Sequence, residues 1–142
     1  ALAGVSAARG DVVLIHDAAR PFPSRLLIER VLEGARRSGA CIPVIPEVDT
    51  LRRVDDSGFA RPESVDRAGL VRVQTPQGFA REVLIAALQA WHAEALLPDD
   101  AAAVLAIGRP VIAVAGDTWN IKITTPADLE FAGRLASSLR IV

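Results

Sequence analysis

The sequence lacks several features that are typical of secreted, membrane-spanning or nucleic-acid-binding proteins. Its single cysteine, Cys41, cannot form a disulfide within the chain, and the apolar neighbours in GACIPVIP favour a buried side chain over a reactive thiol. No apolar run approaches the roughly 20 residues that span a bilayer, and the first residues do not follow a signal-peptide pattern. The 16 basic and 17 acidic residues give a net charge of −1, so we expect neither nucleic acid nor a membrane as partner. Together these absences predict a cytoplasmic protein.

Methionine is absent and lysine nearly so. The opening residues, ALAGVSAARGD, show neither a helix cap nor a strand pattern, so we expect the natural protein to be longer than this chain. Lys122 is the only lysine and lies in the apolar stretch NIKIT, whereas every other basic residue is arginine. Composition leaves two interpretations of Lys122 equally open: the position requires an ammonium group, or the lysine is retained by chance at a strand edge.

The order of apolar and amphipathic segments predicts one α/β domain. The chain has 142 residues, of which 51% are hydrophobic, and this length suits a single core. The continuous run Val12–Ile15 is typical of a strand that is buried on both faces. Ser24 is suited to cap a following helix, and Gly39 lies just beyond the end of that helix. Because strands and helices alternate along the chain, we expect a mostly parallel sheet.

The remaining segments continue this alternation. The expected strands are Ala40–Ile45, Leu70–Val73, Val111–Ala115 and Ile121–Ile123. The expected helices are Ala80–Trp91, Asp99–Ile107 and a last one with Thr125 as N-cap, Pro126 as first residue and Asp128 as a favourable first-turn charge. The segment TPQGF, residues 75–79, is expected to be a loop.

One polar excursion, residues 46–68, interrupts the alternation. It contains the turn signal Asp56-Ser57-Gly58, with partial alternation of apolar and polar residues on either side. An excursion of this length is unusual for a loop inside a compact domain. We therefore expect residues 46–68 to form a hairpin-like arm with a functional or partner-contacting role.

The buried strand Val12–Ile15 runs into polar residues. Ligands of open α/β sheets bind beyond the carboxyl ends of the strands, and Asp17 follows such an end. Its carboxylate is suited to a sugar hydroxyl or to a water molecule on a cation, and the guanidinium of Arg20 is suited to a phosphate. A structural alternative stays open, in which Asp17 caps the AARP turn and Arg20 pairs with it.

Five motifs, taken in order, carry a family resemblance. They are IHDAARPF, VDTLRR, SVDRAGLVRVQTPQGF, a DD pair that opens an alanine-rich helix, and NIKITTPADL. In this order they resemble the 2-C-methyl-D-erythritol 4-phosphate cytidylyltransferase family of the non-mevalonate isoprenoid pathway. The resemblance implies a Rossmann-like nucleotidyltransferase sheet with a protruding β-arm, and residues 1–142 would be part of a cytidylyltransferase domain.

The resemblance also implies a reaction and a set of site residues. Members of the family transfer CMP from CTP to 2-C-methyl-D-erythritol 4-phosphate and release pyrophosphate, with Mg²⁺ bridging phosphates and no metal ligand expected in this chain. The implied catalytic residues, which orient the substrate phosphate, are Lys122 and Arg67. The implied substrate-binding residues are Asp17, Ala18, Arg20, Thr50 and Thr75. The family arm reaches across the two-fold axis of a homodimer, so Thr50 and Arg67 would serve the partner's site.

Two departures from the family pattern limit these expectations. No segment matches the glycine-rich AAGxGxR loop or the PK turn that hold the triphosphate of CTP, so the chain resembles the C-terminal part of such an enzyme. We therefore expect the chain alone to be inactive and to bind CTP negligibly. Pro98 stands where the family usually has a threonine before the acidic pair, which removes one hydroxyl contact.

Several alternatives stay open at the level of sequence. The substrate could be ribitol phosphate or another alditol phosphate, or the chain could be a non-catalytic dimerisation or binding domain. Without the resemblance, Thr50 and Arg67 are ordinary exposed arm residues, and Thr75 is ordinary loop chemistry. His16 is expected to be a strand-end histidine bonded to the backbone, and the resemblance gives it no other role. Some family members carry a zinc cyclase domain as well, and the sequence does not say whether one follows Val142.

Overall fold

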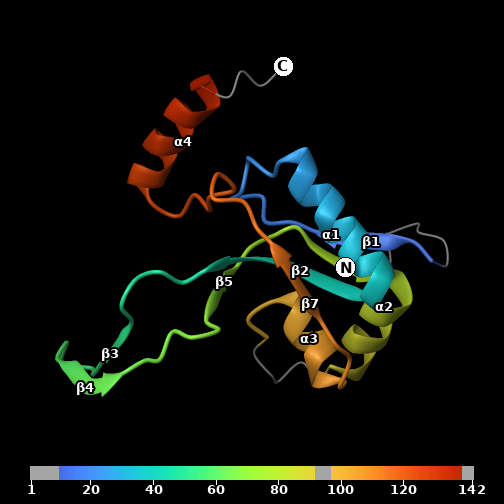
Figure 1. Ribbon diagram of the computed structural model, residues 1–142, viewed down its shortest axis with the longest axis horizontal. Coiled ribbons are helices and arrows are strands. Elements are labelled where there is room, and N and C mark those ends of the chain that lie inside the picture. The colour runs from blue at the N-terminus through green and yellow to red at the C-terminus, as the bar shows by residue number, and fades with distance from the viewer. Residues whose placement is uncertain (1–9, 92–96, 139–142) are drawn as a thin grey trace.

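In a computed structural model, residues 10–91 and 97–138 are described, and they form a five-stranded sheet, a two-stranded arm and four helices (Figure 1). The strands of the large sheet are β1 (Val12–Ile15), β2 (Ala40–Pro46), β5 (Val71–Val73), β6 (Gln77–Ala80) and β7 (Ile112–Ala115). β1, β2 and β7 run in one direction, whereas β5 and β6 run opposite to them. The α/β class is confirmed, and the sheet is mixed, with β2 and β7 as its parallel pair. Residues 1–9 and Val142, which bear on the expectations about the chain ends, lie outside the described residues.

Strand β6 lies between β1 and β2, where the sequence predicted a loop. It pairs antiparallel with both neighbours, so the prediction of a loop at 75–79 was wrong for residues 77–79. Ala80, expected to begin a helix, is the last residue of this strand. The strand contains Gly78. A Cβ at this position would lie 2.8 Å from Cγ1 of Val31 in the first helix, so the glycine permits close helix–sheet packing and does not signal a turn.

The predicted strand Ile121–Ile123 is also wrong, because this segment forms no ladder in the structure. A single backbone hydrogen bond, from the N–H of Ile123 to the carbonyl of Ala19 at 2.8 Å, ties it to the chain beyond β1. The stretch between β7 and the last helix is therefore an irregular loop, and this loop carries Lys122.

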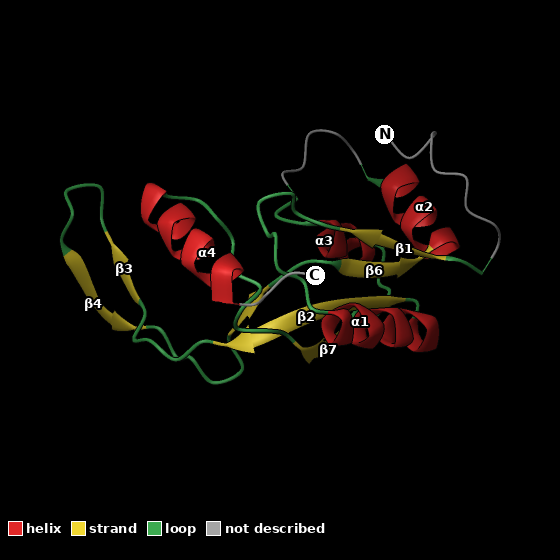
Figure 2. Cartoon of the chain, turned by 90° about the horizontal axis from the view of Figure 1, so that it is seen from above, coloured by secondary structure: helices red, strands yellow, loops and turns green. Residues whose placement is uncertain are grey.

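Helices cover both faces of the sheet (Figure 2). α1 (Arg25–Ser38) lies on one face, and α2 (Arg81–Ala90) and α3 (Asp100–Ala106) lie on the other. The apolar stripe of α1 packs against Cys41, whose thiol has its pKa raised to about 11 by burial, so the prediction of a buried cysteine is confirmed. The cluster on the opposite face is built around Phe79 of β6.

The predicted caps of α1 are confirmed. The Oγ of Ser24 accepts from the N–H of Leu27 at 3.2 Å, and Gly39 ends the helix at a φ of 87°. This positive φ is a conformation that glycine adopts without steric cost. Because β2 begins directly after Gly39, the cap fixes where the chain turns back into the sheet.

The arm predicted at residues 46–68 is present as a hairpin. Strands β3 (Arg52–Val54) and β4 (Ala60–Ser64) form a separate antiparallel sheet, and Figure 1 shows it extending away from the body. Phe59, near the tip of the arm, is 73% exposed. The arm therefore offers an apolar surface that its own chain does not cover.

Helix α4 (Pro126–Ser138) begins where the sequence predicted. The hydroxyl of Thr125 accepts from the N–H of Asp128 at 3.2 Å, and the Asp128 carboxylate accepts from the N–H groups of Thr124 and Thr125. These hydrogen bonds, above all the one from the Thr124 backbone, lower the pKa of Asp128 from 3.8 to about 2. Among the residues that the structure describes, no helix is long and apolar enough to cross a membrane.

Candidate active site

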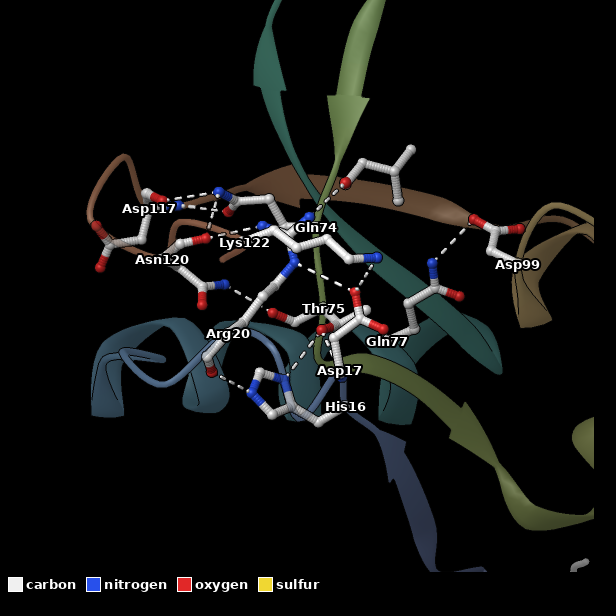
Figure 3. Close-up of polar contacts among 11 residues, drawn as sticks. His16, Asp17, Arg20, Gln74, Thr75, Gln77, Asp99, Asp117, Asn120 and Lys122 are labelled. Carbon is white, nitrogen blue, oxygen red and sulfur yellow. Dashed lines mark hydrogen bonds and ion pairs between the residues drawn. The ribbon is translucent and has the colours of Figure 1, made fainter. Parts of the chain in front are cut away.

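The ion pair between Lys122 and Asp17 lies at the centre of the candidate site (Figure 3). Nζ of Lys122 is 3.0 Å from Oδ2 of Asp17, and their side chains are 46% and 37% exposed. Asp17 follows β1, and Lys122 comes from the irregular loop after β7. The pKa of Asp17 is lowered, chiefly by the hydrogen bond from Lys122. The Asp17 carboxylate is therefore charged at neutral pH, and both side chains of the pair are accessible from solvent.

Arg20 connects these two segments from inside the protein. Its side chain is only 12% exposed, and its Nη1 donates to the carbonyl of Asn120 at 2.9 Å. Nη2 lies 3.4 Å from the carbonyl of Val73, and Nε lies 3.6 Å from Oδ2 of Asp17. Burial lowers the pKa of Arg20, an effect that the charge of Asp17 opposes. The guanidinium thus holds backbone groups of two segments and lies beside Asp17, as the structural alternative from the sequence describes.

Thr75 and His16 form a short chain of hydrogen bonds beside the ion pair. Oγ1 of Thr75 accepts from the backbone N–H of Asp17 at 2.9 Å and lies 3.0 Å from Nδ1 of His16. Nε2 of His16 lies 2.8 Å from the carbonyl of Arg20, so it must carry the hydrogen. In a neutral imidazole, Nδ1 then accepts from the Thr75 hydroxyl. The expectation of a strand-end histidine bonded to the backbone is confirmed.

A cleft of about 520 Å³ opens over these residues. Its lining includes four of the predicted site residues, Asp17, Arg20, Thr75 and Lys122. The opposite wall carries Pro98, Asp99 and Asp100 at the start of α3. The pKa of Asp100 is raised, first by burial and then by the neighbouring Asp99. The cleft therefore combines one accessible ammonium group with hydroxyl and carboxylate groups, which is a suitable set for a phosphorylated polyol.

The other predicted residues lie elsewhere in the chain. Ala18 is exposed in the turn that the hydrogen bond from the N–H of Arg20 to the carbonyl of Asp17 closes at 3.0 Å. Thr50 is exposed at the base of the arm. Arg67 donates to the carbonyl of Val48 and lines a separate open hollow on the arm. A single chain thus does not bring Thr50 or Arg67 into the cleft with Lys122.

Comparison with known proteins assigns the family. The sequence model of the family described as "IspD: 2-C-methyl-D-erythritol 4-phosphate cytidylyltransferase" matches residues 1–137. The chain belongs to this family. A 2-C-methyl-D-erythritol 4-phosphate cytidylyltransferase of Thermus thermophilus is 45% identical over 133 residues, which cover 93% of this chain and 62% of that protein.

Relatives of two lengths match the chain. The bifunctional enzyme IspD/IspF of Anaeromyxobacter dehalogenans is 45% identical over 136 residues, which are 93% of this chain but 35% of that enzyme. The crystal structure of the Thermus thermophilus cytidylyltransferase superposes with a TM-score of 0.81 at 46% identity, covering 89% of this chain and 62% of that one. The chain therefore spans less than two thirds of these family members.

Three buried amides of the site were missed by the sequence analysis. Gln74, Gln77 and Asn120 are 3%, 2% and 0% exposed. Within the described chain their side chains bond mainly to backbone groups of segments far away in sequence. For the two glutamines, the available signal is their position on either side of Thr75-Pro76, next to apolar strands. A polar side chain that is buried at such a place needs hydrogen-bond partners.

The described residues do not form a metal site of their own. No group of three or more His, Cys, Asp or Glu side chains within residues 10–91 and 97–138 is arranged to hold a metal ion. The carboxylate of Asp17, which lines the cleft, is already paired with the ammonium group of Lys122. The donor set of this part of the chain therefore does not fit a protein-held Mg²⁺ ion.

Proposed function

We propose that the protein to which this chain belongs transfers CMP from CTP to 2-C-methyl-D-erythritol 4-phosphate. Family membership and the identity to named cytidylyltransferases support this activity. The single observation that carries it in the structure is the position of Lys122. Lys122 is the only lysine of the sequence, and its ammonium group lies beyond the carboxyl ends of β1 and β7. The cleft around it is large enough for a small phosphorylated ligand.

The proposed reaction is a displacement at phosphorus. An oxygen of the substrate phosphate forms a bond to the α-phosphorus of CTP, while the bond from that phosphorus to the pyrophosphate oxygen breaks. Pyrophosphate leaves with the electron pair, so no proton has to be removed from the phosphate nucleophile. The protein then contributes positioning and positive charge. Lys122 holds the substrate phosphate, and Asp17 and Thr75 bind hydroxyl groups of the polyol.

Mg²⁺ and a second subunit complete the proposal. Because the described residues supply no metal site, we assign Mg²⁺ to the phosphate groups of the nucleotide. We assign Thr50 and Arg67 to the site of the partner in a homodimer. The exposed apolar residues of the arm and the absence of Arg67 from the cleft of its own chain support this assignment. A cytoplasmic enzyme without nucleic-acid or membrane partners is part of the same proposal.

The test is an assay of the full-length protein with CTP and a panel of polyol phosphates. We expect pyrophosphate release with 2-C-methyl-D-erythritol 4-phosphate, and a strong preference for it over ribitol 5-phosphate and other alditol phosphates. Lys122→Ala serves as the control and should raise the Michaelis constant for the polyol phosphate. Turnover with ribitol 5-phosphate alone would change the substrate, and no turnover with any member of the panel would refute the proposed activity.

A further inference from the structure

The segment Gln74-Thr75-Pro76-Gln77 lies between the two walls of the cleft. Both of its glutamines are buried, and each bonds to a different wall. Gln74 reaches the loop that carries Lys122, whereas Gln77 reaches the start of α3. Burying a carboxamide is unfavourable unless its hydrogen bonds are satisfied, so each glutamine is informative about what it holds.

Gln74 binds the backbone of the Lys122 loop through both ends of its carboxamide. Its Oε1 accepts from the N–H of Asp117 at 3.0 Å. Its Nε2 donates to the carbonyl of Asp117 at 2.8 Å and lies 3.3 Å from the carbonyl of Asn120. One side chain therefore replaces the ladder bonds that a neighbouring strand would supply to this loop.

The loop depends on such bonds because it has no secondary structure of its own. β7 ends at Ala115, and no strand or helix is assigned until α4 begins at Pro126. Asn120 adds a bond in the reverse direction, since its Nδ2 donates to the carbonyl of Thr75 at 2.7 Å. Lys122 lies two residues beyond Asn120, so the place of its ammonium group follows from where these side chains hold the loop.

The backbone of the loop fits closely around the Gln74 carboxamide. A Cβ added to Gly116 would lie 2.6 Å from Oε1 of Gln74 and 3.0 Å from the carbonyl oxygen of Val44. Even alanine at this position would therefore displace the carboxamide. The glycine thus gives an independent way to disturb the contact without changing Gln74.

Gln77 makes a comparable contact on the other side. Its Nε2 donates to Oδ2 of Asp99 at 2.9 Å, and its Oε1 accepts from the N–H of Ala101 at 3.1 Å. Gln77 is as deeply buried as Gln74, but these partners belong to α3 and its cap and not to the loop. The chain thus offers two matched glutamines, of which one supports Lys122.

We propose that Gln74 is the positioning residue that fixes Lys122 for the substrate phosphate, and that Gln77 supports the opposite wall independently of Lys122. The inference rests on the proposed function, because it takes the polyol phosphate as the ligand of Lys122. Both ends of the Gln74 carboxamide are bonded to the backbone of Asp117 and Asn120, so Gln74 acts through that backbone.

The experiment uses Gln74→Met in the full-length enzyme, because methionine keeps the length of the side chain and removes its hydrogen bonds. We expect the Michaelis constant for the polyol phosphate to rise about 10-fold, and the constant for CTP to rise less, because three backbone groups of the Lys122 loop each lose a hydrogen bond with Gln74. Combined with Lys122→Ala, the same substitution should add less than about 3-fold, since the two act on one interaction. Gln77→Met is the matched control, and its effect should be the same with or without Lys122.

The possible outcomes separate a failure of the proposed role of Lys122 from a failure of the proposed role of Gln74. If Lys122→Ala leaves the Michaelis constant for the polyol phosphate unchanged, the proposed role of Lys122 fails. If Lys122→Ala raises it but Gln74→Met does not, only the inference about Gln74 is overturned. Equal coupling of both glutamines to Lys122 would also overturn it, because it would indicate general loosening of the fold. Should Gln74→Met not fold, Gly116→Ala replaces it in the same cycle with the same expected coupling.

Discussion

Nζ of Lys122 lies 3.0 Å from Oδ2 of Asp17, although the two residues come from opposite ends of the described chain. An ion pair of this exposure stabilises a fold by only about 0–1 kcal/mol. The pair therefore matters more for the direction of the ammonium group than for stability. A phosphate that enters the cleft meets a cation that is already held in place.

Lys122→Arg in the full-length enzyme should reduce turnover by about 10-fold or more. The guanidinium is larger and planar, whereas the space beside Asp17 is filled by an ammonium group that approaches from the loop. Steady-state kinetics with CTP and the polyol phosphate measure the effect. Wild-type kinetics would show that the single lysine is a chance survivor of an arginine-rich composition.

Asp17→Asn should lower catalytic efficiency by roughly 10-fold, because Lys122 loses its charged partner and the polyol loses a charged acceptor. The fold should persist, since the turn is closed by the backbone bond from Arg20 to the carbonyl of Asp17. Kinetics and thermal unfolding are measured on the same preparation. Normal kinetics with a lowered melting temperature would instead support a purely structural carboxylate.

The helices and their caps could be predicted because their signals are local. Ser24, Gly39 and Thr125 act on backbone groups within a few residues of themselves. Strand β6 could not be predicted, because it is a strand only by virtue of β1 and β2 on either side. Its glycine serves the close approach of α1.

The candidate site divides in the same way. The family resemblance named Asp17, Arg20, Thr75 and Lys122 as site residues, and in the structure these four line one cleft. Their roles stay predictions. The supporting amides were missed because their partners lie 22 to 46 residues away along the chain, and nothing in the local pattern names them. The assignment of Arg67 to a partner's site stays a prediction, since it depends on a second chain.

Mixed dimers test that assignment. If Arg67 acts across the interface, Arg67→Ala and Lys122→Ala subunits, each impaired at low concentrations of the polyol phosphate, should complement each other when mixed. Half of the dimers are then mixed and one of their two sites is intact, so roughly a quarter of wild-type activity is the ceiling for a closed two-fold dimer. Native mass spectrometry confirms that mixed dimers are present. No recovery in such a sample would place Arg67 in its own chain's site or in none.

Gly34→Ala should destabilise the protein by about 1–3 kcal/mol, despite the better helix propensity of alanine. The added Cβ would lie 2.5 Å from Sγ of the buried Cys41. Denaturant unfolding gives the change in free energy. The second substitution Cys41→Ala removes the clash and should recover part of the loss. If it recovers nothing, the close contact is not the cause.

Asp128→Asn should lower the unfolding temperature at neutral pH, because the carboxylate accepts from the start of α4. The folded-state pKa of about 2 lies below the ordinary 3.8. The charged form thus contributes stability above about pH 4, and this contribution is lost as the pH falls toward about 2. Unfolding midpoints of both proteins across this range should converge in acid. A constant difference down to the lowest pH would contradict the assignment.

The place of β6 in the sheet has a consequence for the order in which the chain assembles. Among the described residues, β1 pairs with β6 alone, and Val12 lies opposite Ala80. During synthesis, the apolar strand Val12–Ile15 leaves the ribosome long before its partner does. Until α1, β2 and the whole arm have emerged, the edge of β1 that pairs with β6 stays open, which is the kind of surface that chaperones bind and that aggregates recruit. Closing this long-range pairing is a late event with a high entropic barrier, whereas the local packing of α1 on β2 can form first.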